Sequence, residues 1–433
     1  MEFLDVLRYL YFTRPYNTMK LGLFRIEQLL SRMGNPHLGV KYFHITGSNG
    51  KGSVTTFLEY LTYYHGYNVT GFYSPHLSTI LERFHWNTKL ISKDEFVEAS
   101  EFVKVFAEEM DKIGDEFSPS FFEYMTAMYF YLTKQKNAEY GSVEVGLGGR
   151  FDSTNVITPV VSVITTVSLE HTNVLGKTVE EIAFEKAGII KQGVPVVVGN
   201  MAKEAKDVIK NVANERGAKF YEFGKDFYAE VVKYDFNKNL YNYYGELTMK
   251  NIPVRLNGKH QLYNFALALK AFEIINKLDE DAAKKAFENA FIPGRFELFD
   301  GLILDGSHNP QAAEILSENI DIYFPDKKLA ALFGIVDDKD KIRVLEKLGP
   351  KFEVLIVTKP PTKRAQKIEE TYNIAKQFCK SVILEPDPIA GIELLKQIDS
   401  DVKFVTGSFY LIGLIRDYLK NGFVSDELRI GGA

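Results

Sequence analysis

The sequence predicts an α/β protein of two domains, each built around a mostly parallel β-sheet. Runs of β-branched and aromatic residues alternate with amphipathic stretches of helical length, as in strands connected by helices. This pattern is interrupted at Pro293-Gly294, after which a second alternation of the same kind begins. A chain of 433 residues suits two or three domains. We therefore expect domains over residues 1–293 and 294–433, with any active site in the cleft between them.

In the first domain, short apolar runs predict strands, and the longer amphipathic stretches between them predict helices. The expected strands are residues 42–46, 69–73, 140–145, 160–167 and 194–198, and the expected helices are 53–65, 93–112, 120–134, 178–190 and 202–215.

Residues 226–256 differ from the rest, because their side chains alternate in polarity with a period of two. The turn-forming residues Asn237-Lys238-Asn239 divide this stretch, which predicts a small antiparallel hairpin inserted in the first domain. A helix is expected to follow. The last predicted elements are that helix, residues 261–277, and the second domain's strands at 302–304, 329–333, 354–357 and 403–406.

Composition and charge exclude several classes of protein. A net charge of −5 with interspersed basic residues gives no support to a nucleic-acid surface. The single cysteine, Cys379, excludes an internal disulfide and a cysteine-based zinc cluster. Glu2 and Asp5 stand where a signal peptide would be basic, and the longest apolar stretch, 156–169, is too short to span a membrane. We expect a cytoplasmic protein with neither nucleic-acid nor membrane partners.

The stretch KYFHITGSNGKGSVTTFLEYL, residues 41–61, places a glycine-rich turn between a predicted strand and a predicted helix. Backbone N–H groups in such a turn attract phosphate, while Lys51 would add charge and Ser53 a hydroxyl. The spacing departs from the common phosphate loop, because Gly47 lies four residues before Lys51 and Gly52 follows it. Phosphate binding is favoured over an ordinary tight turn with an incidental lysine.

Two further stretches follow predicted strands. Ser74 comes after residues 69–73, at the sheet edge where ligands bind, although an ordinary loop is the preferred interpretation of this stretch taken alone. In EVGLGGRFDSTN, Glu144 leads into Gly146, Gly148 and Gly149. Glycines so close to a carboxylate indicate a backbone that approaches a ligand.

His171 and Lys186 belong to a stretch that follows a very apolar predicted strand. A neutral His171 imidazole could bind a metal ion, but a lone histidine is more often a hydrogen-bonded loop residue. Lys186 lies in an amphipathic helix, where a solvated lysine is the default interpretation.

In LILDGSHNP, Asn309 can cap the following helix, with Pro310 at its first position. The cap leaves Asp305, Ser307 and His308 without a structural explanation.

Taken in order, these stretches resemble the folylpolyglutamate synthase and dihydrofolate synthase family, relatives of the Mur ligases. The resemblance extends from about residue 20 to 415, with Ser48 where the family usually has Thr and with the family's glycine kept at position 52. It is carried by MKLGLFRIEQLL, TGSNGKGS, YSPHL, EVGLGGRFDSTN, LEHTNVLGKTVEEIAFEKAGIIK, GKHQLYNFALAL, PGRFE, LDGSHNP, FGIVDDKD and VTGSFYLIG.

The resemblance implies an N-terminal phosphate-loop ATPase-like domain and a C-terminal Rossmann-like domain. It further implies an ATP-dependent ligase that adds L-glutamate to the γ-carboxyl of a folate through an acyl phosphate, with Mg²⁺, expected as two ions, as cofactor. The enzyme is expected to be a monomer whose partners are folate, L-glutamate and ATP.

The resemblance also assigns site residues. ATP would be bound by Asn49, Gly50, Lys51, Gly52, Ser53, Asn264, Arg295 and Asp305, and folate by Phe122, Phe151, Asp152 and Ser153, with Leu21–Leu23 nearby. Metal ligands would be Ser74, Glu144, His171 and Lys186, the last as a carbamate formed with carbon dioxide; Lys51, Lys186 and His308 would take part in catalysis.

Other functions stay open. A dihydrofolate synthase, or an enzyme with both activities, would use the same chemistry on dihydropteroate; Ser153, where some bifunctional members have Ala, favours polyglutamylation. A cell-wall-precursor ligase fits the motifs less well, and the short loop disfavours a generic phosphate-loop ATPase. A non-catalytic nucleotide-binding protein predicts eroded motifs, yet Lys51, Glu144 and Arg295 are all present.

Overall fold

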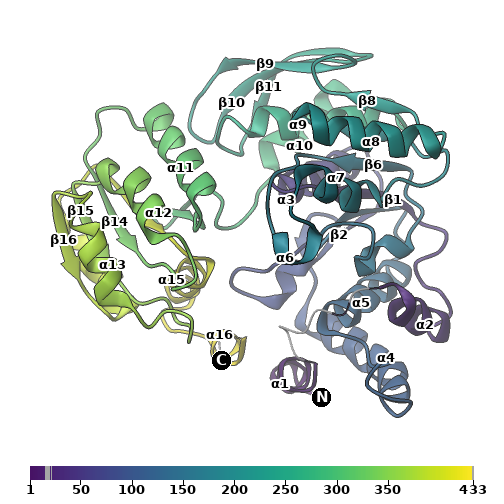
Figure 1. The fold of residues 1–433 in the computed structure, drawn as a ribbon, viewed down its shortest axis with the longest axis horizontal. Helices are drawn as coiled ribbons and strands as arrows, with labels where there is room; N and C mark the ends of the chain where they lie inside the picture. The colour runs from purple at the N-terminus through teal and green to yellow at the C-terminus, as the bar shows by residue number, and fades with distance from the viewer. Residues whose placement is uncertain (15–19, 21, 432–433) are drawn as a thin grey trace.

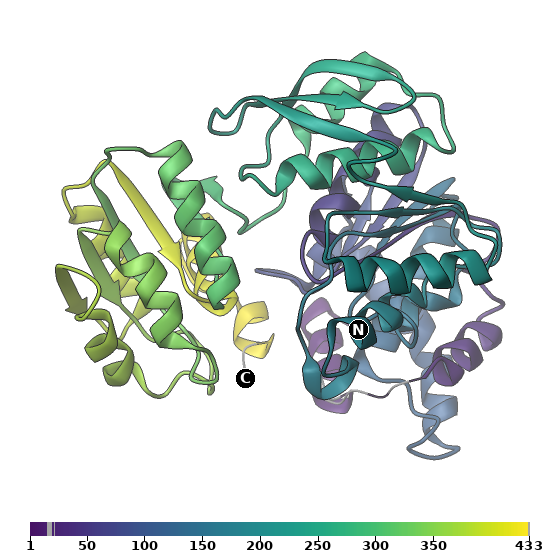
Figure 2. The same ribbon diagram turned by 45° about the horizontal axis from the view of Figure 1, so that its top comes forward.

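The computed structural model describes residues 1–14, 20 and 22–431, which form two α/β bodies side by side (Figures 1 and 2). The described residues make an eight-stranded sheet and a three-stranded sheet in the first body, and a six-stranded sheet in the second. The predicted α/β class, with mostly parallel sheets and a small antiparallel one, is confirmed.

The large sheet has the strand order β4-β3-β2-β5-β1-β6-β7-β8. It is parallel from β2 across to β8, while β3 and β4 add an antiparallel edge. The five predicted strands are confirmed, and β3, β4 and β8 are additional. The strands are β1 (Lys41–Thr46), β2 (Val69–Phe72), β3 (Phe84–Trp86), β4 (Lys89–Leu90), β5 (Tyr140–Glu144), β6 (Val161–Ile164), β7 (Val196–Val198) and β8 (Phe220–Glu222).

Helices cover both faces of this sheet. Successive side chains of a strand point to opposite faces, and here the side chains on both faces are largely buried and apolar. One face packs on α3, α9 and α10, and the other on α5, α7 and α8. Capping boxes at Ser92, Ser120 and Thr178 fix where α4, α5 and α7 begin. The helices are α1 (Phe3–Thr13), α2 (Phe24–Arg32), α3 (Lys51–Tyr64), α4 (Lys93–Asp111), α5 (Phe121–Gln135), α6 (Thr172–Leu175), α7 (Val179–Ala187), α8 (Lys203–Glu215), α9 (Gln261–Glu273) and α10 (Glu280–Asn289), with 3₁₀ turns η1 (Ile80–Arg83) and η2 (Ser153–Val156).

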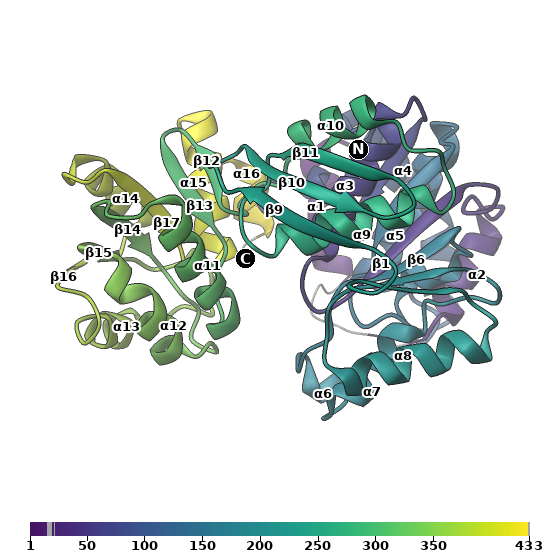
Figure 3. The same ribbon diagram turned by 90° about the horizontal axis from the view of Figure 1, so that it is seen from above.

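The insert has three strands, so the prediction of a simple hairpin was wrong in its extent. The expected turn separates β9 (Tyr228–Lys233) from β10 (Asn239–Tyr244), and a second turn at residues 245–247 leads into β11 (Thr248–Val254). The third strand brings more apolar side chains, including Met249 and Ile252, onto the core shared with α9. Figure 3 looks down on this small sheet, which lies over α9.

The second sheet has the order β12-β13-β17-β14-β15-β16 and is parallel except for β12. The four predicted strands are confirmed; β12 and β16 are additional. The strands are β12 (Glu297–Phe299), β13 (Leu302–Asp305), β14 (Leu329–Phe333), β15 (Val354–Val357), β16 (Ser381–Leu384) and β17 (Val402–Thr406). The helices are α11 (Pro310–Tyr323), α12 (Lys341–Leu348), α13 (Ile368–Ala375), α14 (Pro388–Gln397), α15 (Phe409–Asn421) and α16 (Asp426–Gly431), with η3 (Gly349–Lys351).

The last helix returns to the first body. In Figure 1, α16 lies beside α1, and Ile430 packs against the apolar cluster to which α1 and α5 contribute. Within the described residues, no helix is long and apolar enough to cross a membrane.

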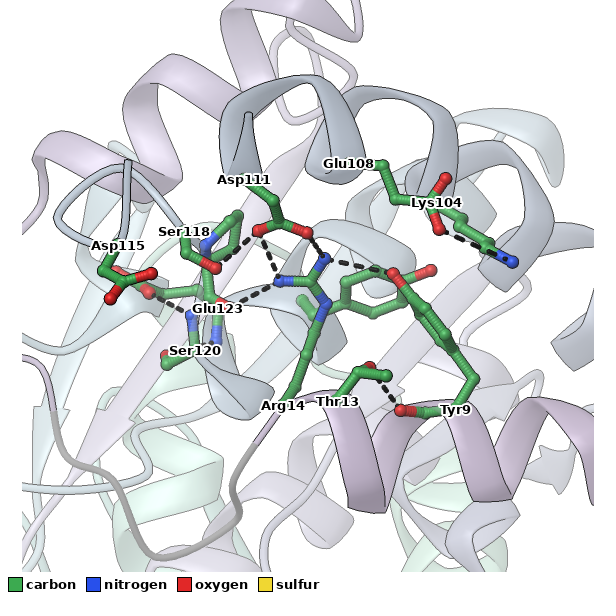
Figure 4. A network of polar contacts seen from close by, with 12 residues as sticks. Tyr9, Thr13, Arg14, Lys104, Glu108, Asp111, Asp115, Ser118, Ser120 and Glu123 are labelled. Atoms are coloured by element: carbon green, nitrogen blue, oxygen red, sulfur yellow. Dashed lines mark hydrogen bonds and ion pairs between the residues drawn. The ribbon is translucent and has the colours of Figure 1, made fainter. Parts of the chain in front are cut away.

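Arg14, at the end of α1, anchors that helix to the segment between α4 and α5 (Figure 4). Its guanidinium is buried and donates to Asp111 Oδ2 at 2.8 Å, to the Pro119 carbonyl at 2.8 Å and to the Tyr9 hydroxyl at 3.1 Å. Ser118 donates to the same aspartate. A buried guanidinium with several acceptors stabilises the fold only while each partner stays in place.

Arg14→Met should lower the free energy of unfolding by about 2–4 kcal/mol, because it leaves the buried Pro119 carbonyl and the partly buried Asp111 without their donor. Arg8→Met is the matched control: Arg8 makes an exposed ion pair with Asp5, and its removal should change stability by less than about 1 kcal/mol. Denaturant unfolding of both variants measures the difference. Equal effects would show that Arg14 does not anchor α1.

Candidate active site

The predicted site residues lie at the carboxyl ends of neighbouring strands. Ser74 follows β2, Glu144 ends β5, the glycine-rich turn follows β1 and His171 follows β6; these strands are adjacent in the order β2-β5-β1-β6. In the second body, Asp305 ends β13, the neighbour of β17. Carboxyl edges of parallel strands are where open α/β sheets bind ligands.

Hydrogen bonds hold the glycine-rich turn against the loop after β6. The Ser48 N–H donates to the Thr166 carbonyl at 2.9 Å, and the Asn49 N–H donates to Thr166 Oγ1 at 3.0 Å. Gly50 has a φ of 87° and lies so close to Asn264 that a Cβ there would overlap its amide oxygen. The Lys51 ammonium donates to the Gly47 carbonyl at 2.8 Å. The turn is thus compact, with its lysine folded back over it at the N-terminus of α3.

Glu144 is the buried carboxylate of this edge. Its Oε2 accepts the Ser74 N–H at 3.0 Å, and a Cβ built on Gly52 would lie 3.7 Å from either oxygen, which places the turn next to it. Burial raises the pKa of Glu144, while the positive charges of Lys51 and Arg295, together with the Ser74 N–H, lower it. Because Arg295 lies beyond Pro293-Gly294, cations from both bodies act on one carboxylate.

Lys186 is buried, so its interpretation as a solvated lysine is wrong. Its side chain is 1% exposed, and the ammonium donates to Glu170 Oε1 at 2.8 Å. Burial, together with the nearby charge of Lys51, lowers the pKa of Lys186 to about 8, although Glu170 opposes the shift. Gly149 permits this arrangement, since a Cβ there would lie 3.0 Å from the Lys186 carbonyl.

His171 is exposed and adopts a left-handed backbone with a φ of 46° before α6. Over the described part of the chain, no three His, Cys, Asp or Glu side chains form a group that could hold a metal ion. The predicted metal ligands therefore do not form a preassembled cluster of these residue types, and the set depends on the Ser74 hydroxyl and a modified Lys186.

In the second body, Arg295 and His308 lie against the Phe409 ring, and Asp305 is hydrogen-bonded to the start of the loop that carries His308. Asp305 Oδ1 accepts the Ser307 N–H at 3.0 Å, and burial raises the pKa of its carboxyl while Ser307 and Arg295 lower it. The Arg295 guanidinium lies 4.6 Å from the centre of the Phe409 ring, and the His308 ring centre lies 5.3 Å from it. Arg295 keeps contact with solvent, although the surrounding protein lowers its pKa by desolvation.

One ring nitrogen of His308 is hydrogen-bonded within the protein. Its Nδ1 lies 2.8 Å from the Gly306 carbonyl, to which it donates, so the Nε2 lone pair is left to accept a proton. Burial lowers the pKa of His308, as do Lys339 and Arg295. The imidazole is thereby held in its neutral form.

The predicted folate residues occupy two kinds of environment. Phe122 lies over Gly146 and 5.8 Å from Phe72, and Phe151 is 42% exposed. Asp152 accepts the Leu147 N–H at 2.9 Å, and Ser153 bonds Thr126 at 2.7 Å, so both side chains are engaged within the protein. Of Leu21–Leu23, Leu21 lies outside the described residues.

Sequence reasoning missed Gln261 and Phe409. Gln261 donates to Ser53 Oγ at 3.2 Å and accepts from Asn264 at 3.1 Å, which links α9 to the start of α3. Its spacing of three residues from Asn264 on one helix was an available signal. Phe409 follows β17, and only the topology places β17 beside β13.

Comparison with known proteins identifies the class. The Mur ligase middle domain matches residues 45–272, and the Mur ligase glutamate ligase domain matches residues 294–409. The chain therefore belongs to the Mur ligase family.

Its relatives place it within that family. A dihydrofolate synthase/folylpolyglutamate synthase of Bacillus subtilis is 32% identical, over 93% of this chain and 96% of the relative. The crystal structure of a Thermotoga maritima folylpolyglutamate synthase superposes with a TM-score of 0.92 at 39% identity, covering 99% of each chain. An Escherichia coli structure in complex with DHPP and ADP superposes with a TM-score of 0.85 at 27% identity, covering 97% of this chain and 98% of that one. This chain belongs to the folylpolyglutamate and dihydrofolate synthase branch.

Arg295→Met should raise the pKa values of Asp305 and Glu144, because it removes a positive charge that lowers both. Carboxyl ¹³C NMR titration measures the shifts. Arg343→Met serves as the control, since Arg343 is exposed and its ion pair is with Asp340. Unchanged pKa values of both carboxyl groups in Arg295→Met would show that the charge of Arg295 acts on neither of them.

Proposed function

We propose that the protein is a folylpolyglutamate synthase, an ATP-dependent ligase that adds L-glutamate to the γ-carboxyl of a tetrahydrofolate. The observation that carries the proposal is the glycine-rich turn, with Lys51 folded over it, held beside the buried Glu144, on which the charge of Arg295 from the second body also acts. Joining an anionic folate to an anionic amino acid and a polyphosphate requires clustered cations. The membership of the branch supports the same reaction.

In this proposal, the two bodies share the binding of ATP. The N–H groups of the glycine-rich turn and the Lys51 ammonium would hold the phosphates, and Asn264, Arg295 and Asp305 would complete the site. The ADP in the E. coli structure supports a nucleotide site in this branch. The Lys51 ammonium must then exchange the Gly47 carbonyl for a phosphate oxygen.

The residues present also fit magnesium. Glu144 supplies a buried carboxylate, Ser53 and Ser74 supply hydroxyls, and oxygen donors of these kinds suit Mg²⁺; the His171 imidazole is a less usual ligand. When bound, the ion would neutralise charge on the phosphates. We propose that two Mg²⁺ ions bind, the second beside Lys186.

The chain's own residues suit the two bond-forming steps. The folate γ-carboxylate attacks the γ-phosphorus of ATP and ADP leaves, with Lys51 and Arg295 stabilising the charge that shifts between the oxygens. The glutamate amine then attacks the acyl carbon and phosphate leaves. His308 Nε2 would take a proton from the incoming ammonium, and Phe122 and Phe151, beside residues 152–153, would contact the folate.

A further part of the proposal is that Lys186 carries a carbamate. The neutral amine attacks the carbon of CO₂, an N–C bond forms, one C=O electron pair moves to oxygen and the amine loses a proton to water. A pKa of about 8 gives an appreciable fraction of neutral amine near neutral pH. The resulting anion would be a second carboxylate-type ligand on the metal side of the site.

Dihydrofolate synthase activity is the second candidate. The B. subtilis relative carries both names, and the E. coli structure holds DHPP. Ser153 favours the polyglutamylation reaction, but its hydroxyl is bonded to Thr126, so its effect on folate choice would be indirect. We also propose a cytoplasmic monomer whose domains meet at residue 294.

A phosphate-release assay with ATP, Mg²⁺ and L-glutamate tests the function. Tetrahydrofolate, methylenetetrahydrofolate and dihydropteroate are compared as acceptors, and mass spectrometry identifies the product. Glutamate added to tetrahydrofolate alone supports a dedicated folylpolyglutamate synthase, and addition to both supports a bifunctional enzyme. No ligation of glutamate to any acceptor would refute the proposal.

Lys51→Ala should lower turnover by about 10²-fold or more while the fold is kept, because the cation acts where charge shifts in the transition state. Lys41→Ala, which changes a lysine at the opposite end of β1, is the control and should turn over normally. Turnover and circular dichroism measure the two effects. Wild-type turnover in Lys51→Ala would refute the phosphate-loop interpretation.

Lys186 should give a ¹³C carbamate signal with labelled CO₂. At constant dissolved CO₂ the signal should grow as the pH rises through about 8, because the neutral amine is the reactive form. The signal should vanish in Lys186→Arg. Lys191→Arg is a close control, since burial lowers the pKa of Lys191 to about 8 as well.

Activity gives a second readout for the carbamate. Lys186→Ala should be nearly inactive, and acetate should restore part of its rate by supplying a carboxylate. A carbamate signal that disappears with Lys191 rather than Lys186, or full activity in Lys186→Arg, would refute the assignment.

A further inference from the structure

The loop between β2 and β3 touches both bodies within a few residues. At its start, the Ser74 N–H donates to Glu144 at 3.0 Å, so this end belongs to the Glu144 edge of the first body. Three residues later, Leu77 packs against the apolar cluster that α14 and α15 form with the second sheet. A partly buried side chain of the first body therefore packs against the core of the second.

Leu77 is received by a socket formed by Gly294, Ile412 and Gly413. A Cβ on Gly294 would lie 2.7 Å from Leu77 Cδ2 and 2.8 Å from Ile412 Cδ1, and a Cβ on Gly413 would overlap the Leu77 carbonyl oxygen. Gly413 lies inside α15, where glycine is a poor helix former. The close approach of the Leu77 backbone gives a physical reason for a glycine at that position.

Charged groups hold the same loop. Glu82 accepts the Leu77 N–H at 2.6 Å, and its Oε1 lies 4.0 Å from Arg416 Nη1 on α15. Arg416 also bonds Glu297 at 3.1 Å. From α16, Glu427 accepts the Ile80 N–H at 2.6 Å. The second body thus holds the loop by an apolar contact at Leu77 and by polar contacts at Ile80 and Glu82.

We propose that Leu77 is a positioning residue for the proposed ligase reaction, on which the inference rests: seated in the Gly294–Ile412–Gly413 socket, it sets Ser74 and Glu144 in place relative to Arg295. On each side of the contact, few residues separate the socket from the site. Leu77 follows Ser74 by three residues, and Gly294 directly precedes Arg295. The contact therefore joins the two halves of the site through little intervening chain.

The chemistry gives this connection a consequence. An acyl phosphate formed on one body must meet the glutamate amine before water reaches it, so the two halves must stay in register. Loosening the socket would leave each half intact while their relative position varied. The expected result is ATP hydrolysis that is less tightly coupled to amide formation.

Leu77→Ala and Gly413→Ala test the proposal in the full-length protein. Both should slow amide formation by about 10–100-fold, as misplacement of reacting groups does, and should raise the ADP released per amide formed. Gly413→Ala is the sharper variant, because alanine favours the helix while its Cβ displaces the Leu77 backbone.

Leu394→Ala is the matched control, since Leu394 packs on the same apolar cluster from α14, within the second body. It should keep the wild-type ratio of ADP to amide, and thermal unfolding shows whether each variant is folded. A wild-type ratio in both socket variants, or an equal rise in Leu394→Ala, would overturn the inference.

Small-angle X-ray scattering separates this inference from the proposed function. If the wild-type protein ligates no glutamate, the proposed function fails, but the socket can still be judged. Leu77→Ala should then broaden the distribution of interatomic distances relative to wild type, and Leu394→Ala should not. An unchanged distribution in Leu77→Ala would refute the socket.

Discussion

The site depends on one buried carboxylate that cations from two bodies surround. Glu144 lies at the end of a central strand, where burial opposes its ionisation and Lys51, Arg295 and the Ser74 N–H favour it. Burial alone would favour the neutral acid, so these neighbours are what favours the carboxylate form of Glu144. The glycine-rich turn, the loop after β2 and the linker between the bodies must therefore keep their mutual positions, and the glycines within them permit the close contacts.

Much of the fold could be predicted because the central strands of a parallel sheet are continuous apolar runs. The strands that were missed, such as β8, β12 and β16, are short or lie at sheet edges, where partial exposure weakens the pattern. The third strand of the insert was missed for a related reason, since its turn at 245–247 has a less distinctive composition than Asn237-Lys238-Asn239.

The candidate site residues were easier to select from the sequence than their environments were to predict. The sequence motifs indicated Lys51, Glu144 and Asp305 as candidates. The default interpretation of Lys186 as a solvated lysine was wrong, because its side chain is buried. The signal was present: Lys186 lies four residues after Ile182 and three after Ala183, on the buried face of α7. Contacts such as Arg295 on Phe409 arise from strand order, which short-range patterns do not encode.

Cys379, the single cysteine of the chain, is buried and lies with its Sγ 3.2 Å from the Phe352 carbonyl, and burial raises the pKa of its thiol. A thiol that is both shielded and protonated reacts slowly with alkylating reagents. The protein with its single native cysteine should therefore react little with thiol-specific labels. One exposed residue on each body could be replaced by cysteine and labelled with a pair of fluorophores, so that rearrangements between the bodies during turnover could be followed in single molecules.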